Sequence, residues 1–472
     1  MGCRTIQNLH VVCGGNELIK VYSANLNKDI KAEPMQKRNS TTKNAAWIIS
    51  CKIVQALLGV IVNMLSARYL GPSNYGLLSY AASIVAFVLP IVQLGFRSTL
   101  VSEIIDNPDK EGEIIGTSLF FNLLSSIACI VGVSAFVYVA NPNEITTLLV
   151  CALYSISLIA QALEMICYWY QAKLIAQYTS ITGLVAYIIV TIYKIYLLAT
   201  NKSVYWFAVA NALDYFIIAI VLIVFYFKLS NQKLKVSFKR FRQMFAKSKF
   251  FIISSLMVTI FAQTDKIMLK GMMTEKDVGI YSAAVTCAGM TSFVFAAIID
   301  SFRPAIFENK KISVEAYEKS IIVCYSVIIF LSLAQSIVCT VFSKLIIAIL
   351  YGAEYAESAK VLGLVVWYTT FSYLGPIRNV WILAENKQKY LWIINLSGAV
   401  CNVLLNAVLI PVMGIMGAAC ASLITQIFTN VIIGFIMKPI RDNNRLMLKG
   451  CNPIHILRYV KRVSVNLKKK SG

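Results

Sequence analysis

Charged residues are scarce in this chain. They make up 14% of its 472 residues, whereas hydrophobic residues make up 58%. The mean hydropathy is +0.70. A soluble protein of this length needs more polar surface than this composition supplies, so an ordinary soluble domain is excluded. Apolar runs of about 20 residues recur along the chain. Because roughly 30 Å of hydrocarbon requires about 20 helical residues, these runs predict membrane-spanning helices.

Histidine, paired cysteines and phosphate-binding loops are also missing or rare. The two histidines, His10 and His455, lie in polar tails, which excludes imidazole chemistry within the spans. The 12 cysteines are scattered singly without a C-x-x-C pair, as expected for small packing residues rather than a disulfide or metal framework. No G-x-x-x-x-G-K-[ST] motif is present, and the loops are too short for a nucleotide-binding domain. We therefore expect no cofactor, no metal site and no ATP-driven transport by this chain alone.

The predicted fold is an all-α integral membrane protein with about 12 transmembrane helices in two six-helix bundles. The spans are expected at about residues 45–66, 77–96, 114–139, 146–168, 178–199, 205–227, 250–271, 280–302, 319–343, 358–384, 388–411 and 414–437. The expected domains are a tail (1–44), the first bundle (45–227), a basic linker (228–249), the second bundle (250–437) and a basic tail (438–472). Met35 resembles an alternative start, so residues 1–34 are expected to be a dispensable or misannotated extension.

Basic residues decide the expected orientation. The net charge is +22, from 44 Lys and Arg against 22 Asp and Glu. With the N-terminus inside, 35 basic residues fall in tails and inner loops and seven in outer loops. This bias predicts that both termini are cytoplasmic and that the excess charge serves orientation and contact with anionic lipid rather than nucleic-acid binding. In the linker, Phe238, Phe241 and Phe245 recur at helical spacing among lysines and arginines, which predicts a short helix lying in the inner interface. Contact with anionic lipid explains its charge, and a role in recruiting substrate is the alternative.

Two helices carry similar polar stripes, one in each half. At 100° per residue, one face of the second span holds Ser79, Ser83, Ala86, Pro90, Gln93 and Arg97. The eighth span repeats the layout with Ser282, Thr286, Gly289, Phe293, Ala296 and Asp300. Two similar halves that enclose a polar path are typical of a carrier.

Polar residues inside other spans are further candidates, because such residues usually face a bundle interior or a watery cavity. In the first span, Lys52 and Asn63 share a face, although Lys52 could also extend to the inner interface. Asp214 lies near mid-membrane and either pairs with a lysine or takes up a proton, since burial favours the neutral carboxyl. The candidates for a gate or an ion site are Asp214, Asp265 and Lys266; for the last two, a structural ion pair is the alternative. Asn395 and Asn402 share a face of the eleventh span and serve either helix packing or contacts with sugar hydroxyls.

Arg97, Arg303 and Arg378 are expected at the cytoplasmic ends of spans. Guanidinium groups bind diphosphate in bidentate fashion and stay charged. Together with Lys52 they form a predicted cationic entrance for a phosphate-bearing ligand. The positive-inside rule alone would also place arginines there, so both interpretations stay open.

Three segments resemble the polysaccharide-biosynthesis flippases, the O-antigen-unit translocases of the multidrug/oligosaccharidyl-lipid/polysaccharide exporter superfamily. They are Ala-Arg-Tyr-Leu-Gly-Pro-Ser-Asn-Tyr-Gly-Leu-Leu-Ser-Tyr near the start, Thr-Asp-Lys-Ile-Met-Leu with Val-Gly-Ile-Tyr-Ser-Ala-Ala in the middle, and Asn-Val-Leu-Leu-Asn-Ala-Val-Leu-Ile-Pro-Val-Met-Gly-Ile-Met-Gly-Ala-Ala near the end. The resemblance covers about residues 45–437, and it carries functional positions over most directly for Asp265 and Lys266.

The resemblance implies a V-shaped pair of bundles, a central cavity and alternating access. It implies a substrate, an oligosaccharide unit on undecaprenyl diphosphate, that moves from the cytoplasmic to the outer leaflet of the bacterial inner membrane for O-antigen, lipopolysaccharide or capsule synthesis. A polysaccharide polymerase and a chain-length regulator are implied partners, and coupling to H⁺ or Na⁺ stays open. The chain is expected not to be an enzyme. A cation-coupled drug exporter is the alternative, with a membrane enzyme acting on lipid-linked sugars behind it.

Overall fold

The structure, a computed structural model, describes residues 35–230, 232–454 and 456–457, with the side chains of 35–53, 56 and 57 left out. The extension 1–34 and His10, His455 therefore lie outside the described residues. Within the described chain, ten helical segments are long and apolar enough to span a membrane. The protein is a multi-pass, all-helical membrane protein, as predicted.

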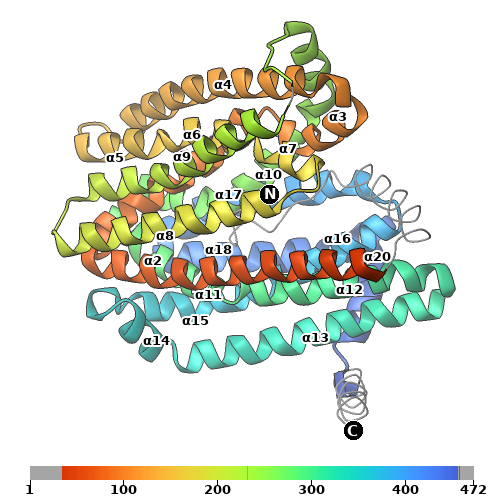
Figure 1. The fold of residues 1–472 in the computed structure, drawn as a ribbon. Helices are drawn as coiled ribbons and strands as arrows, with labels where there is room; N and C mark the ends of the chain where they lie inside the picture. The colour runs from red at the N-terminus through yellow and green to blue at the C-terminus, as the bar shows by residue number, and fades with distance from the viewer. Residues whose placement is uncertain (1–34, 231, 455, 458–472) are drawn as a thin grey trace. The chain divides into compact units, whose positions relative to one another are not determined.

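Contacts divide the chain into two compact units, with the boundary between Gly271 and Met272. The N-terminal unit contains α2 (Met35–Val92), α3 (Leu100–Asp106), α4 (Glu111–Ala140), α5 (Ile145–Ser155), α6 (Ser157–Glu164), α7 (Cys167–Ala172), α8 (Gln177–Ala199), α9 (Val204–Leu229) and α10 (Phe238–Met272). Within it, α9 packs on α5, α6 and α8, and α2 packs on α5 and α8. Figure 1 shows these long helices side by side in red to green.

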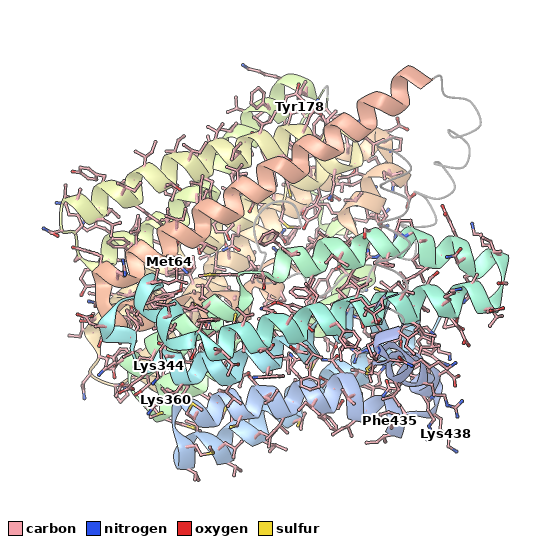
Figure 2. All side chains as sticks on the ribbon, turned by 90° about the horizontal axis from the view of Figure 1, so that it is seen from below. Met64, Tyr178, Lys344, Lys360, Phe435 and Lys438 are labelled. Carbon is pink, nitrogen blue, oxygen red and sulfur yellow. The ribbon has the colours of Figure 1, made fainter. Side chains whose placement is uncertain are left out.

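The C-terminal unit contains α11 (Glu275–Gly289), α12 (Ser292–Ile312), α13 (Val314–Val341), α14 (Ser343–Leu350), α15 (Ser358–Ser372), α16 (Leu374–Ala384), α17 (Leu391–Met413), α18 (Ile415–Ile427), a π-helical turn (Phe428–Ile432), α19 (Ile433–Ile436) and α20 (Arg441–Gly450). α15 lies at its centre and packs on α11, α13 and α18. In Figure 2, Lys344 and Lys360 lie at one end of this unit and Lys438 at the other.

The helices differ from the predicted spans in several places; the expected span 146–168, for example, is divided among α5, α6 and α7. α2 runs through the first two expected spans, which meet at a kink where Gly71 has a φ of 69° before Pro72. Glycine adopts this left-handed conformation without the steric cost that other residues carry. The expected span 358–384 is divided between α15 and α16, and the expected span 280–302 between α11 and α12. Breaks of this kind are decided by packing, which hydropathy does not report.

The linker also differs from its expected form. A helix begins at Phe238, as the spacing of the phenylalanines predicts, but it continues without interruption into the next span as α10. Phe241 stacks on Phe121 of α4 with ring centroids 3.8 Å apart, and Phe245 packs against the same core. Part of the aromatic face that was expected in the lipid interface therefore packs on protein, while Phe238 stays 70% exposed.

Candidate functional site

Arg97 lies on a tight turn at the end of the polar stripe of α2. After Val92 the chain reverses through Leu94 and Gly95, whose φ angles are 49° and 68°, and enters a single 3-10 turn, Phe96–Ser98. Phe96 is fully buried and contacts the Phe241 ring edge-on, with centroids 6.1 Å apart. The buried ring fixes the turn, and Arg97 beside it remains half-buried.

α10 holds this reversal in place. The Ser248 hydroxyl donates a hydrogen bond of 2.9 Å to the Leu94 carbonyl. A Cβ on Gly95 would lie 2.4 Å from the Ser248 carbonyl oxygen, so both the backbone conformation and the close approach require glycine there. The position of Arg97 therefore depends on a residue of the linker helix that is distant in sequence.

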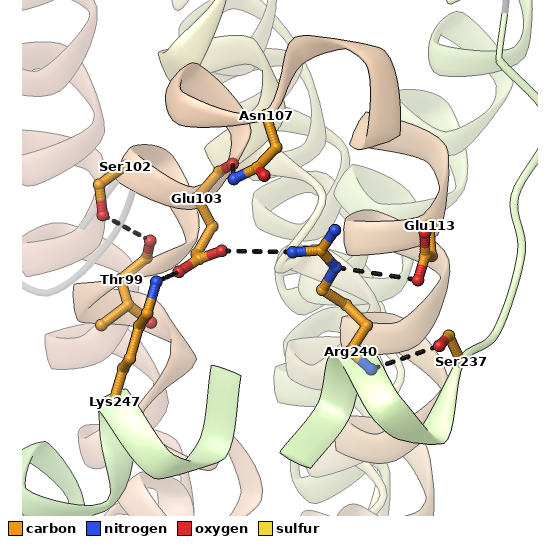
Figure 3. A network of polar contacts seen from close by, with 8 residues as sticks. All are labelled: Thr99, Ser102, Glu103, Asn107, Glu113, Ser237, Arg240 and Lys247. Carbon is orange, nitrogen blue, oxygen red and sulfur yellow. Dashed lines mark hydrogen bonds and ion pairs between the residues drawn. The ribbon is translucent and has the colours of Figure 1, made fainter. Parts of the chain in front are cut away.

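The other charges around this turn neutralise one another. Glu103 is 5% exposed and forms ion pairs with Lys247 and, at 3.9 Å, with Arg240 (Figure 3). Arg240 also lies 3.8 Å from Glu113, and Lys173 pairs with buried Glu111 at 2.6 Å. Within the described part of the chain, the side chain of Arg97 has no ion-pair or hydrogen-bond partner. A guanidinium stays charged and can donate bidentate hydrogen bonds to an anionic group.

The other three predicted entrance cations have different surroundings. Arg303 pairs with Asp300 at 3.0 Å, and both side chains are about half exposed. Arg378 is 5% exposed, and its Nη1 donates to the Thr429 carbonyl at 2.6 Å and to Asn430 Oδ1 at 3.1 Å. These bonds give Arg378 a structural task within the C-terminal unit. The Lys52 side chain lies outside the described residues.

The predicted polar residues of the stripes and faces lie at mixed depths. Asn63 donates to the Tyr75 hydroxyl at 3.2 Å, across the kink of α2. Ser79 and Gln93 are half-buried, whereas Ser83 and Ser282 are only 1% exposed. In α17, Asn402 is fully buried and accepts a hydrogen bond from Asn406 at 3.1 Å, and Asn395 is half-buried. The pair Asn402–Asn406 therefore favours the packing interpretation.

The predicted gate residues lie in two places in the N-terminal unit. Asp214 of α9 is 9% exposed, one turn from Asn211, which accepts a 3.0 Å hydrogen bond from Lys194 of α8. Asp265 of α10 is 8% exposed, and Lys266 is half-buried. One turn further along α10, Lys270 pairs with Glu144 at 2.7 Å.

Sequence reasoning missed the glutamates. Glu103, Glu111 and Glu113 lie in the expected inner loop 97–113, and they pair with basic residues whose expected roles are orientation and contact with anionic lipid. Glu144 was likewise not singled out. Burial on its own would raise the pKa of the Glu144 carboxyl, but hydrogen bonds from Lys270 and Thr147 and the Lys270 charge outweigh this and lower the pKa below its usual value. The signal available in the sequence was charge: an acidic loop and a basic linker on the same expected side.

Comparisons with known proteins agree with this architecture. Residues 41–310 match the model of a family described as polysaccharide biosynthesis protein. The chain is 24% identical over 391 residues to the capsular polysaccharide biosynthesis protein CapF of Staphylococcus aureus, covering 81% of this chain and 96% of that one. It is 25% identical over 198 residues to the probable low-salt glycan biosynthesis flippase Agl15 of Haloferax volcanii, covering 41% and 42% of the two chains.

Two solved structures share the fold. The lipid II flippase MurJ in an inward closed conformation has a TM-score of 0.68 at 15% identity, covering 88% of this chain and 93% of that one. A multidrug resistance MATE family transporter in an inward-facing conformation has a TM-score of 0.63 at 13% identity, covering 84% and 96%. At these identities the likeness shows the fold alone.

Proposed function

This chain belongs to the polysaccharide biosynthesis protein family, and we propose that it is a flippase for lipid-linked oligosaccharides. Its substrate is an oligosaccharide unit on undecaprenyl diphosphate, which it moves from the cytoplasmic to the outer leaflet of the bacterial inner membrane by alternating access. The product serves capsule or O-antigen synthesis, where a polymerase and a chain-length regulator act next. The CapF and Agl15 relatives support the substrate class, and the expected orientation places both termini in the cytoplasm.

The observation that carries this proposal is Arg97. A diphosphate with several sugars cannot shed its water into hydrocarbon, so a flippase must offer polar groups along the way. Arg97 ends the polar face of α2 and, among the described residues, has no internal partner. The adjacent Lys247 and Arg240 are occupied by Glu103. Arg97 is therefore the group of this turn that meets the diphosphate, and the half-exposed Arg303 is the corresponding candidate in the C-terminal unit.

The experiment is surface-polymer display in a strain whose own flippase gene is deleted. Arg97→Ala and Arg303→Ala are expected to lower display while the protein stays in membranes at the normal level. A charged hydrogen bond contributes about 1.5–3 kcal/mol, so the affinity for undecaprenyl diphosphate in nanodiscs should fall by roughly ten- to a hundredfold for Arg97→Ala. Arg97→Lys keeps the charge but not the bidentate geometry and should fall between. Normal display by both alanine variants would refute the role of these arginines.

A cation-coupled drug exporter is the second candidate, favoured by the MATE-like fold and by buried Asp214. Overexpression should then raise resistance to cationic dyes, and Asp214→Asn should abolish that resistance without affecting polymer display. If the chain is a flippase, overexpression should not raise resistance to the dyes, and polymer display should depend on Arg97 and Arg303. Neither candidate makes or breaks a covalent bond.

A further inference from the structure

The linker is fastened along the start of α4. The Gly112 amide donates to Gln232 Oε1 at 3.0 Å, the Lys235 amide donates to the Gly112 carbonyl at 3.2 Å, and the Ser237 amide donates to the Thr117 hydroxyl at 3.0 Å. A Cβ on Gly112 would lie 2.4 Å from the Lys233 carbonyl oxygen, so the two backbones approach as closely as glycine allows. Because of these backbone contacts, the linker residues 232–237 pack as part of the N-terminal unit.

The first turns of α10 also contact the N-terminal unit, through ion pairs and a stacked pair of rings. Glu103 of α3 pairs with Lys247 and Arg240 on one side of α10 (Figure 3), and Phe241 stacks on Phe121 of α4. Glu103 is nearly fully buried, whereas the Lys247 side chain is 63% exposed, so separating the helices leaves the Glu103 carboxylate without its partners. This end of α10 therefore separates from α3 and α4 only at considerable cost.

The far end of α10 is fastened to the same unit. Lys270 is 5% exposed and pairs with Glu144, the residue before α5, at 2.7 Å. Lys247 and Lys270 are 23 residues apart, or about 35 Å along a helix at 1.5 Å per residue. The two ion pairs thus hold opposite ends of a membrane-length helix, both to the N-terminal unit.

The chain leaves this unit immediately after Lys270. The boundary of the units follows Gly271, and Thr274 then starts α11 with a capping box in which Thr274 and Asp277 exchange hydrogen bonds. A Cβ on Gly271 would meet nothing within 4 Å, so packing does not require glycine at this helical position. A helical glycine weakens its helix relative to alanine, and hinges consist of a few residues at the ends of elements.

We propose that α10 moves as a rigid part of the N-terminal unit and that Gly271 is the hinge through which the chain passes into the C-terminal unit. This replaces the expected boundary at residues 228–249 by one at the other end of α10, across the membrane. The role of this hinge rests on the proposed function, because a flippase that works by alternating access requires a hinge between its two units. Its test does not depend on the substrate.

The test measures distances between spin labels in the full chain, in lipid nanodiscs, with the 12 native cysteines replaced by serine. One pair joins Ile253 of α10 to Ile105 of α3, and the other joins Ile253 to Val314 of α13; all three side chains are exposed. The Ile253–Ile105 distribution is expected to be narrow and the Ile253–Val314 distribution broad. The Gly271→Ala variant should narrow the second distribution and leave the first unchanged.

Gly132→Ala is the matched control, because a Cβ there also meets nothing within 4 Å, in the middle of α4. It should change neither distribution. Gly271→Ala should also lower polymer display about two- to fivefold, the factor expected from stiffening one helical position, and Gly132→Ala should not. A broad Ile253–Ile105 distribution, two equally narrow distributions, or identical behaviour of the two alanine variants would overturn the proposal. If both distance distributions agree with the proposal but the protein does not restore polymer display, the flippase function is refuted and the hinge proposal is still supported.

Discussion

The guanidinium of Arg378 donates a 2.6 Å hydrogen bond to the backbone carbonyl of Thr429, within the π-helical turn of the last long span. A second bond from the same nitrogen reaches Asn430 Oδ1, whose own amide donates to Gln426 at 2.6 Å. A π-turn changes the backbone pairing of a helix, and here a buried arginine binds one of its carbonyls. Arg378 therefore stabilises the C-terminal unit, whatever else it contacts.

Replacing Arg378 should destabilise the protein. Arg378→Ala removes two hydrogen bonds from a charged donor, each contributing about 1.5–3 kcal/mol, and should lower the unfolding temperature in detergent. Arg303→Ala, at a side chain 45% exposed and paired with nearby Asp300, is the control and should change the unfolding temperature little. If the two variants unfold at the same temperature, the structural role of Arg378 is wrong.

Glu103 should contribute more to stability than Glu113. Glu103→Gln leaves Lys247 without its partner and weakens the hold on Arg240, and we expect a loss of about 1–3 kcal/mol. The Glu113 side chain is 29% exposed and lies 3.8 Å from Arg240, so Glu113→Gln should cost less. The test is thermal unfolding of both variants in the same detergent. Equal losses of stability would contradict the larger contribution of Glu103.

Ser248 should act on ligand binding through Arg97. Ser248→Ala removes a hydrogen bond of about 1 kcal/mol from the Leu94 carbonyl, and undecaprenyl diphosphate should then bind about fivefold more weakly in nanodiscs. The Arg97→Ala/Ser248→Ala double variant should bind no more weakly than Arg97→Ala, because both changes act on one contact. Ser102→Ala is the control, since that hydroxyl bonds a carbonyl of its own turn at 2.8 Å. Additive losses in the double variant would refute the link.

Stability should depend on pH through Glu144. Its pKa in the folded protein is lowered, so the carboxylate stabilises the fold above its ordinary pKa of about 4.5, and this contribution disappears as the pH falls through the lowered value. Glu144→Gln should therefore unfold more readily than the parent chain at pH 7, with the difference shrinking toward pH 3. Unfolding temperatures measured over this range give the result. A difference that grows on acidification would have the wrong sign.

The amount predictable from sequence differs between helices and contacts. The membrane class, the approximate spans and the linker helix at Phe238 follow from local composition and spacing, because each span must satisfy its own backbone in lipid. The same logic marks Arg97 as a candidate, at the end of a polar face. It does not show that Arg97 has no partner among the residues that the structure describes, while Arg378 bonds both Thr429 and Asn430. That distinction depends on which side chains meet.

By itself, the sequence determined that this chain crosses the membrane many times and carries polar residues along particular helix faces, since hydropathy and helical period act over neighbouring residues. Only the tertiary structure decided which charged side chains pair with one another. Glu103 meets Lys247 across 144 residues, and Lys270 meets Glu144 across 126, so these pairs leave no trace in local pattern. Those contacts, made because buried charges need partners, assign α10 to the N-terminal unit.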